Sequence, residues 1–161
     1  MLSKVMQDTL NEHVNHEYHS SYIYQSMSAY CEYINLPGFA RWLRERSENK
    51  ERNARRSLDF INDRKNQVAL EPITQPPVEF QSVLDVMQKA LEHERQMTEA
   101  IHRFYQAAVN EGDYATQVHL QQFIGEQVQG ERATDLILEQ LRMIANQPDA
   151  LLLLDRELAR G

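Results

Sequence analysis

Residues 64–81, RKNQVALEPITQPPVEFQ, form the one long segment of this chain without helical periodicity, and they contain three of its five prolines. On each side of this segment, two long stretches with apolar residues at helical spacing are joined by a short turn. Short turns make antiparallel helix pairs. The segment itself, at ~3.3 Å per residue, is long enough to run the length of a helix of about 27 residues. The pattern predicts two helical hairpins joined by one long crossover, a known arrangement of four-helix bundles.

The expected fold is all-α, with a single domain over residues 1–161. Asn35-Leu36-Pro37-Gly38 marks the turn of the first hairpin, and Gly112-Asp113 marks that of the second. Ser82, with Asp85 three residues later, is a candidate N-cap. A generic up-down helical protein with a flexible loop is the alternative that spacing leaves open. Five helices are expected, at about residues 3–33, 37–63, 82–111, 114–145 and 148–159.

Composition narrows the classes of function. The chain has 161 residues, 42% of them hydrophobic, which is enough for a sizeable core. Its net charge of −7 does not suggest a nucleic-acid partner. A single cysteine, Cys31, allows no internal disulfide and no thiolate metal site. The start of the chain does not resemble a signal peptide, and no stretch reaches the ~18 apolar residues of a membrane span. We therefore expect a cytoplasmic protein without a membrane partner.

Four stretches carry a family resemblance. They are NHEYHSSYIYQSMSAYC (15–31), KALEHERQ (89–96), IGEQVQGE (124–131) and PDALLLLDRELARG (148–161). In them the chain resembles bacterial non-haem ferritins over its whole length. The resemblance implies a ferritin-like four-helix bundle with a long B–C crossover and a short C-terminal fifth helix. It also implies a cage of 24 subunits that stores iron as Fe2+/Fe3+.

The resemblance also assigns site residues. Ferritin-like di-iron bundles use a Glu from each of two helices and a Glu-x-x-His from each of the others, because iron prefers carboxylate and imidazole ligands. Glu17 and Glu94 fall in the ligand positions, and Gln127 falls where the family places a glutamine beside the site. Tyr24 corresponds to the family's nearby tyrosine. These residues are the predicted remnant of a metal site.

The second helix departs from the family pattern. Lys50 stands in the position of the bridging Glu, and Asn53 stands in that of the His. A protonated lysine has no lone pair for a metal and repels Fe(II). Moving the register by one residue brings Glu51 into the position but puts Ala54 in place of the His. We interpret Lys50 as a built-in cation that neutralises the buried carboxylates, as in vertebrate light-chain ferritin subunits. Restoring Lys50→Glu and Asn53→His is expected to raise oxidation activity.

The chain also lacks residues that other iron and haem sites of the family require. A third iron site in some bacterial ferritins requires acidic residues where this chain has Asn49, Gln129 and Gly130, and Glu126 alone remains. Glu45 and Glu48 are possible weak interior iron sites on an otherwise basic helix. No methionine lies between residues 37 and 63, so we expect no haem. The row His13, His16 and His19 is expected on the surface or at an interface.

The sequence therefore predicts a ferritin cage subunit for iron storage that lacks ferroxidase activity and co-assembles with a catalytic ferritin subunit. The alternative is a ferroxidase-active ferritin that oxidises Fe(II) with O2 at an atypical site made of Glu17, Glu94, Gln127 and Glu51. A DNA-protecting mini-ferritin of twelve subunits is a third hypothesis. The proline-rich crossover and the terminal helix argue against it.

Overall fold

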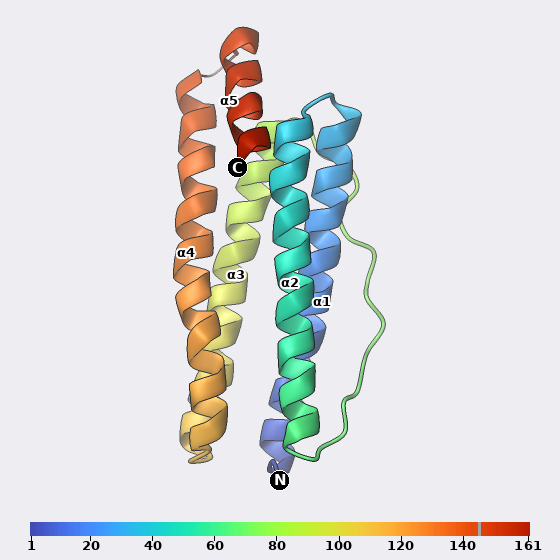
Figure 1. Ribbon diagram of the computed structural model, residues 1–161, viewed down its shortest axis with the longest axis vertical. Coiled ribbons are helices and arrows are strands. Elements are labelled where there is room, and N and C mark those ends of the chain that lie inside the picture. The colour runs from blue at the N-terminus through green and yellow to red at the C-terminus, as the bar shows by residue number, and fades with distance from the viewer. Residues whose placement is uncertain (145) are drawn as a thin grey trace.

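The computed structural model describes residues 1–144 and 146–161, and this part of the chain folds into five α-helices without a strand. Figure 1 shows α1–α4 as a long bundle, with the crossover running along α1 and with α5 at the end where α4 finishes. None of the described helices is long and apolar enough to cross a membrane. The helices are α1 (Lys4–Tyr33), α2 (Pro37–Asp63), α3 (Val83–Asn110), α4 (Tyr114–Ile144) and α5 (Pro148–Arg160).

The predicted helix ends agree with these bounds to within one residue wherever they can be compared. The predicted end of the fourth helix, at residue 145, lies outside the described residues. Local chemistry explains the agreement. The Ser3 hydroxyl accepts a hydrogen bond from the Met6 amide at 3.2 Å, and the Ser82 hydroxyl accepts one from the Asp85 amide at 3.1 Å. Such N-caps satisfy amides that the first turn of a helix leaves free.

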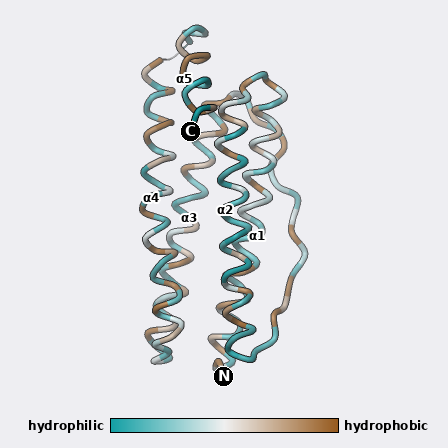
Figure 2. Tube along the Cα trace, viewed as in Figure 1, coloured by the Kyte–Doolittle hydropathy of each residue, from teal (hydrophilic) through white to brown (hydrophobic). Residues whose placement is uncertain are grey.

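The core consists of two hydrophobic clusters with a polar layer between them. One cluster, which includes Met27, Phe39 and Leu43, fills the end of the bundle near α5. The other, which includes Met6 and Phe104, fills the opposite end. Between them α2 contributes the long hydrophilic stretch that Figure 2 shows in the middle of that helix. Buried polar side chains in the middle of a bundle are costly unless they are paired, so this layer is where a functional site is expected.

Helix α5 is held against the start of α2 by a close backbone contact. Asp155 is buried, and its Oδ1 accepts a hydrogen bond from the Phe39 amide at 2.9 Å. Asp155 thereby caps a helix whose own N-cap residue, Leu36, makes no side-chain cap. The contact is possible because Gly38 has no side chain. A Cβ built on Gly38 would lie 1.7 Å from the Asp155 carbonyl oxygen.

Gly38→Ala is therefore expected to loosen α5. Relieving the overlap requires a shift of one backbone against another, at a cost of about 1–3 kcal/mol. Gly125→Ala is the matched control, because a Cβ on this α4 glycine meets nothing within 4 Å. Replacing a helical glycine there should instead stabilise by about 0.5–1 kcal/mol. Hydrogen exchange of the α5 amides measures the effect, and equal α5 exchange rates in the two variants would contradict the prediction.

Candidate functional site

The polar layer brings together the residues that the sequence marked as a former metal site. Glu17 and Tyr24 come from α1, Lys50 and Asn53 from α2, Glu94 from α3 and Gln127 from α4, and all six side chains are buried. The exposed fraction is 0% for Glu94, 2% for Glu17 and 3% for Lys50. These two carboxyl groups and one amino group are thus shielded from water in the middle of one bundle, and each must either be paired inside the protein or become neutral.

Lys50 lies between the side chains of α3 and α4. Its Nζ is 3.3 Å from Glu94 and donates a hydrogen bond at 3.1 Å to Gln127 Oε1. Gln127 Nε2 in turn donates to Glu94 Oε2 at 3.0 Å and to the Glu94 carbonyl oxygen at 3.0 Å. The ammonium and the amide together occupy the space in front of the Glu94 carboxylate.

Arg46 supplies a second cation to the same carboxylate. Its Nη2 lies 3.3 Å from Glu94 Oε1, and the Tyr24 hydroxyl also donates to that oxygen. Burial alone raises the pKa of Glu94, but the charges of Lys50 and Arg46 and the Tyr24 hydrogen bond outweigh it and lower this pKa to about 2. Glu94 is therefore ionised at neutral pH, with both carboxylate oxygens engaged by donors. Arg46 was not among the residues predicted for the site, although it lies one helical turn before Lys50 on the same face of α2.

Glu17 lies in a different environment from Glu94. Within the described part of the chain its Oε2 has no hydrogen-bond partner, and its Oε1 is 3.8 Å from His13 Nε2. Burial is the main cause that raises the pKa of Glu17 to about 7, against the opposing charge of Lys50. The neutral form of Glu17 is therefore far more accessible near neutral pH than that of an ordinary carboxyl group. Of the two carboxylates predicted as metal ligands, Glu17 has fewer hydrogen-bond and ion-pair partners than Glu94.

The position expected for His13, on the surface or at an interface, is wrong. His13 is 1% exposed, and its ring packs against Phe104 and Phe123 with centroid distances of 5.7 and 4.8 Å. Burial, with the neighbouring charges of other basic residues, lowers the pKa of His13 to about 3, so its imidazole is neutral. His13 and Glu17 are four residues apart and so lie on the same face of α1. That face packs into the interior of the bundle.

Asn53, in the position of the family's histidine, is held by a surface ion pair. Its Nδ2 donates to Glu126 Oε2 at 2.9 Å, and its Oδ1 accepts from Arg56 Nη1 at 3.1 Å. Arg56 also pairs with Glu126 at 2.9 Å. Glu126, which the resemblance assigned to a third iron site, is thus paired with Arg56 of α2.

The remaining acidic candidates lie away from the layer. Glu45 is exposed and pairs with Arg41 at 3.2 Å, and Glu48 is exposed as well. Glu51, which an atypical iron site would need, is half exposed and pairs with Arg55 at 2.8 Å. Among residues 1–144 and 146–161, no group of three or more His, Cys, Asp or Glu side chains could hold a metal ion.

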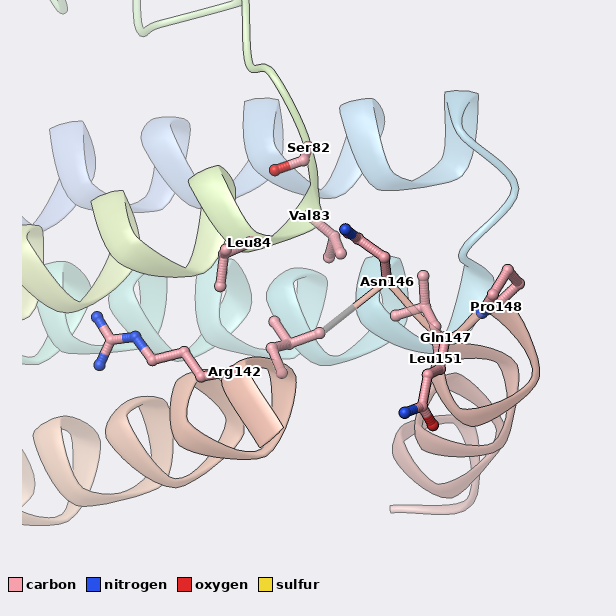
Figure 3. Close-up of a pocket in the computed structure, with 9 residues that line it drawn as sticks. Ser82, Val83, Leu84, Arg142, Asn146, Gln147, Pro148 and Leu151 are labelled. Atoms are coloured by element: carbon pink, nitrogen blue, oxygen red, sulfur yellow. The ribbon is translucent and has the colours of Figure 1, made fainter. Parts of the chain in front are cut away.

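A pocket of about 630 Å3 lies elsewhere, between the start of α3, the end of α4 and the start of α5. Figure 3 shows Val83, Leu84 and Leu151 among the side chains that line it. The lining is mainly apolar and includes none of the predicted site residues. This pocket therefore lies away from the polar layer of the bundle.

Antiparallel helix pairs, one long crossover and glutamates from facing helices at mid-bundle define the class of ferritin-like carboxylate bundles. The comparison with known families agrees, since the ferritin-like domain family matches residues 7–144. The chain belongs to the ferritin family. The comparisons support iron storage as the function of that family.

Similar proteins cover nearly the whole chain. A bacterial non-heme ferritin of Staphylococcus epidermidis is 35% identical over 159 residues, which are 99% of this chain and 96% of the relative. A bacterial non-heme ferritin of Staphylococcus aureus is 30% identical over 158 residues, 98% of this chain and 95% of the relative. The open pore ferritin of the archaeon Archaeoglobus fulgidus superposes with a TM-score of 0.98 at 36% identity, covering 100% of this chain and 99% of that one.

Proposed function

We propose that this chain is a ferritin cage subunit that stores iron without oxidising it at a di-iron site of its own. In this proposal it forms part of a 24-subunit cage together with a catalytic ferritin subunit. The observation that carries the proposal is the Glu94 carboxylate, whose two oxygens are engaged by Lys50, Arg46, Tyr24 and Gln127. A carboxylate in that state offers no free lone pair to Fe(II).

The energetics support the same conclusion. Iron could bind Glu94 only after it displaced or deprotonated a buried lysine. Breaking a buried charge pair costs about 3–5 kcal/mol, which corresponds to a loss of affinity of roughly 10²-fold to several 10³-fold. Asn53 does not offset this loss, because its amide is already engaged with Glu126 and Arg56. The protein cations take the place that the metal has in an active subunit, so the fold keeps its charge balance without iron.

The rate of aerobic Fe(II) oxidation by the purified homopolymer tests the proposal. We expect a rate equal to that of a protein-free control, because no pair of carboxylates is free to hold two irons. A ferritin with a complete Glu-x-x-His set serves as the positive control under the same conditions. A fast, stoichiometric burst from this chain would mean that an oxidising site survives in it, and the proposal would be wrong.

Co-expression tests the second half of the proposal. Cages that contain this chain and a catalytic ferritin subunit should take up iron at a rate set by the fraction of the catalytic subunit. Native mass spectrometry reports that fraction for each preparation. If the two chains form only separate cages, the proposed co-assembly is contradicted while the absence of oxidation remains a separate result.

A slow ferroxidase is the second candidate, and the free Oε2 of Glu17 favours it. Glu51, its fourth proposed ligand, is paired with Arg55 outside the layer. A crystal soaked anaerobically in Fe(II) separates the two candidates. Metal within bonding distance of Glu17 or Glu94 supports the slow enzyme, and an empty layer supports the storage subunit.

A further inference from the structure

The contact between Arg46 and Glu94 adds a second element to the closed site. We propose that Arg46 is a resident cation in its own right, that Gly130 is the residue that admits it, and that this pair excludes divalent cations independently of Lys50 and Asn53. The inference rests on the proposed function and deepens it, because it concerns what keeps the same site closed. It also changes the expectation that Lys50→Glu and Asn53→His raise oxidation activity, because these two substitutions alone then leave the site blocked.

Arg46 belongs to a row of α2 side chains that follow one another at intervals of one helical turn. Trp42, Arg46 and Lys50 follow each other at a spacing of four residues and so lie on one face of α2. The guanidinium carbon of Arg46 lies 5.3 Å from the centroid of the Trp42 ring, a cation–π contact. On its other side Nη2 reaches Glu94 Oε1 at 3.3 Å. The aromatic ring thus supports the guanidinium while the carboxylate fixes its end.

Gly130 on α4 leaves the space that the guanidinium uses. A Cβ at this position would lie 2.5 Å from Arg46 Nη2 and 3.2 Å from Glu94 Oε2. Gly130 is buried within a helix, where glycine is an unfavourable residue relative to alanine. The close approach of Arg46 is a physical reason for a glycine there. Gly125, five residues earlier in the same helix, has open space around its Cβ direction and no such role.

This geometry predicts how the site responds to restored ligands. In the variant Lys50→Glu/Asn53→His, a new carboxylate is added beside Glu94 while Arg46 remains. The guanidinium then has one more carboxylate within reach and competes with a metal ion for the same oxygens. The restored ligands become available to metal only when Arg46 is removed or its guanidinium is displaced.

Anaerobic calorimetry with Co(II) on the assembled protein tests the inference, with visible absorption of bound Co(II) as a second readout. The starting point is Lys50→Glu/Asn53→His, to which Arg46→Ala, Gly130→Ala or the control Gly125→Ala is added. Gly130→Ala keeps the arginine in the chain but requires the end of its guanidinium to shift, because the new Cβ would lie 2.5 Å from Nη2. We expect Arg46→Ala and Gly130→Ala each to tighten Co(II) binding by about tenfold or more, and Gly125→Ala to leave it unchanged.

Each result of this experiment decides one part of the inference. If the two-residue variant already binds Co(II) as tightly as the three-residue variants, Arg46 does not block the site. If Arg46→Ala tightens binding and Gly130→Ala does not, Gly130 is not the residue that admits the guanidinium. Arg46→Ala and Gly130→Ala disturb the same guanidinium by different changes, so either variant still tests Arg46 if the other fails to assemble. The oxidation rate of the unmodified chain decides the proposed function separately, since it uses none of these variants.

Discussion

Glu94→Gln is expected to lower the free energy of unfolding by about 3 kcal/mol at pH 7. The substitution keeps the shape and the hydrogen-bonding capacity of the side chain but removes the charge that two cations share. Lys50 is 3% exposed and cannot turn toward water, so it is left as an uncompensated buried charge. Removing one partner of a buried ion pair typically costs about 3–5 kcal/mol. The midpoint of thermal unfolding of the assembled protein measures the change.

The effect should depend on pH in a defined direction. The pKa of Glu94 in the folded protein is lowered to about 2 from an ordinary value of 4.5. Its ionised form therefore contributes stability that is fully present above about pH 4.5 and is lost as the pH falls toward 2. The difference between the unmodified protein and Glu94→Gln should be constant between pH 6 and pH 8 and should shrink in acid.

Glu51→Gln is the matched control for this prediction. It also removes a carboxylate that pairs with an arginine, but the pair with Arg55 is exposed on one face of α2. Exposed pairs of this kind contribute about 0.3–0.5 kcal/mol. If Glu94→Gln has an effect as small as that of Glu51→Gln, the buried cluster is not the charge-balanced unit described above.

The architecture was predictable because local signals agreed with one another along the chain. Helical periodicity stops at residue 64 and returns after Ser82, and the short connections at Asn35 and Gly112 allow only antiparallel neighbours. Both of these residues have positive φ, 66° and 64°, as tight turns after helices often require. These are properties of a few adjacent residues, and a single sequence contains them directly.

The composition of the site was only partly predictable. Lys50 and Asn53 could be found because the resemblance supplied a position-by-position pattern from which they depart. Arg46 could not be found in this way, because its reach to Glu94 depends on a missing side chain at Gly130, which lies on another helix. The burial of His13 likewise depends on Phe104 and Phe123 of other helices. Spacing within one helix indicates which side chains share a face, but contacts with other helices arise from packing and cannot be read from that spacing.

The two carboxylates of the layer have different charge environments. Lys50 and Arg46 both reach Glu94 at 3.3 Å, whereas the carboxylate of Glu17 faces a neutral His13 at 3.8 Å. Glu94 is stabilised as an anion, whereas Glu17 is held in a place where its neutral form is favoured. The same substitution, Glu to Gln, should therefore have opposite effects on stability at these two positions.

Glu17→Gln is accordingly expected to stabilise the protein at neutral and alkaline pH. The pKa of Glu17 is raised in the folded state to about 7 from an ordinary value of 4.5, mainly by burial. Such a group contributes stability that is fully present below about pH 4.5 and is lost as the pH rises through 7. At 1.36 kcal/mol per pKa unit, the cost of keeping ionised Glu17 in the layer approaches about 3 kcal/mol above pH 8. Glutamine avoids this cost because it has no charge.

Unfolding midpoints of Glu17→Gln and of the unmodified protein, compared at each pH from 5 to 8, measure this gain. Other titrating groups are common to both proteins and cancel in the difference. We expect a difference close to zero at pH 5 that grows steadily toward pH 8. A difference that does not change with pH would show that Glu17 is ionised throughout this range, and therefore that burial does not favour its neutral form. The pH profile thus reports directly on the protonation state of Glu17 in the folded protein.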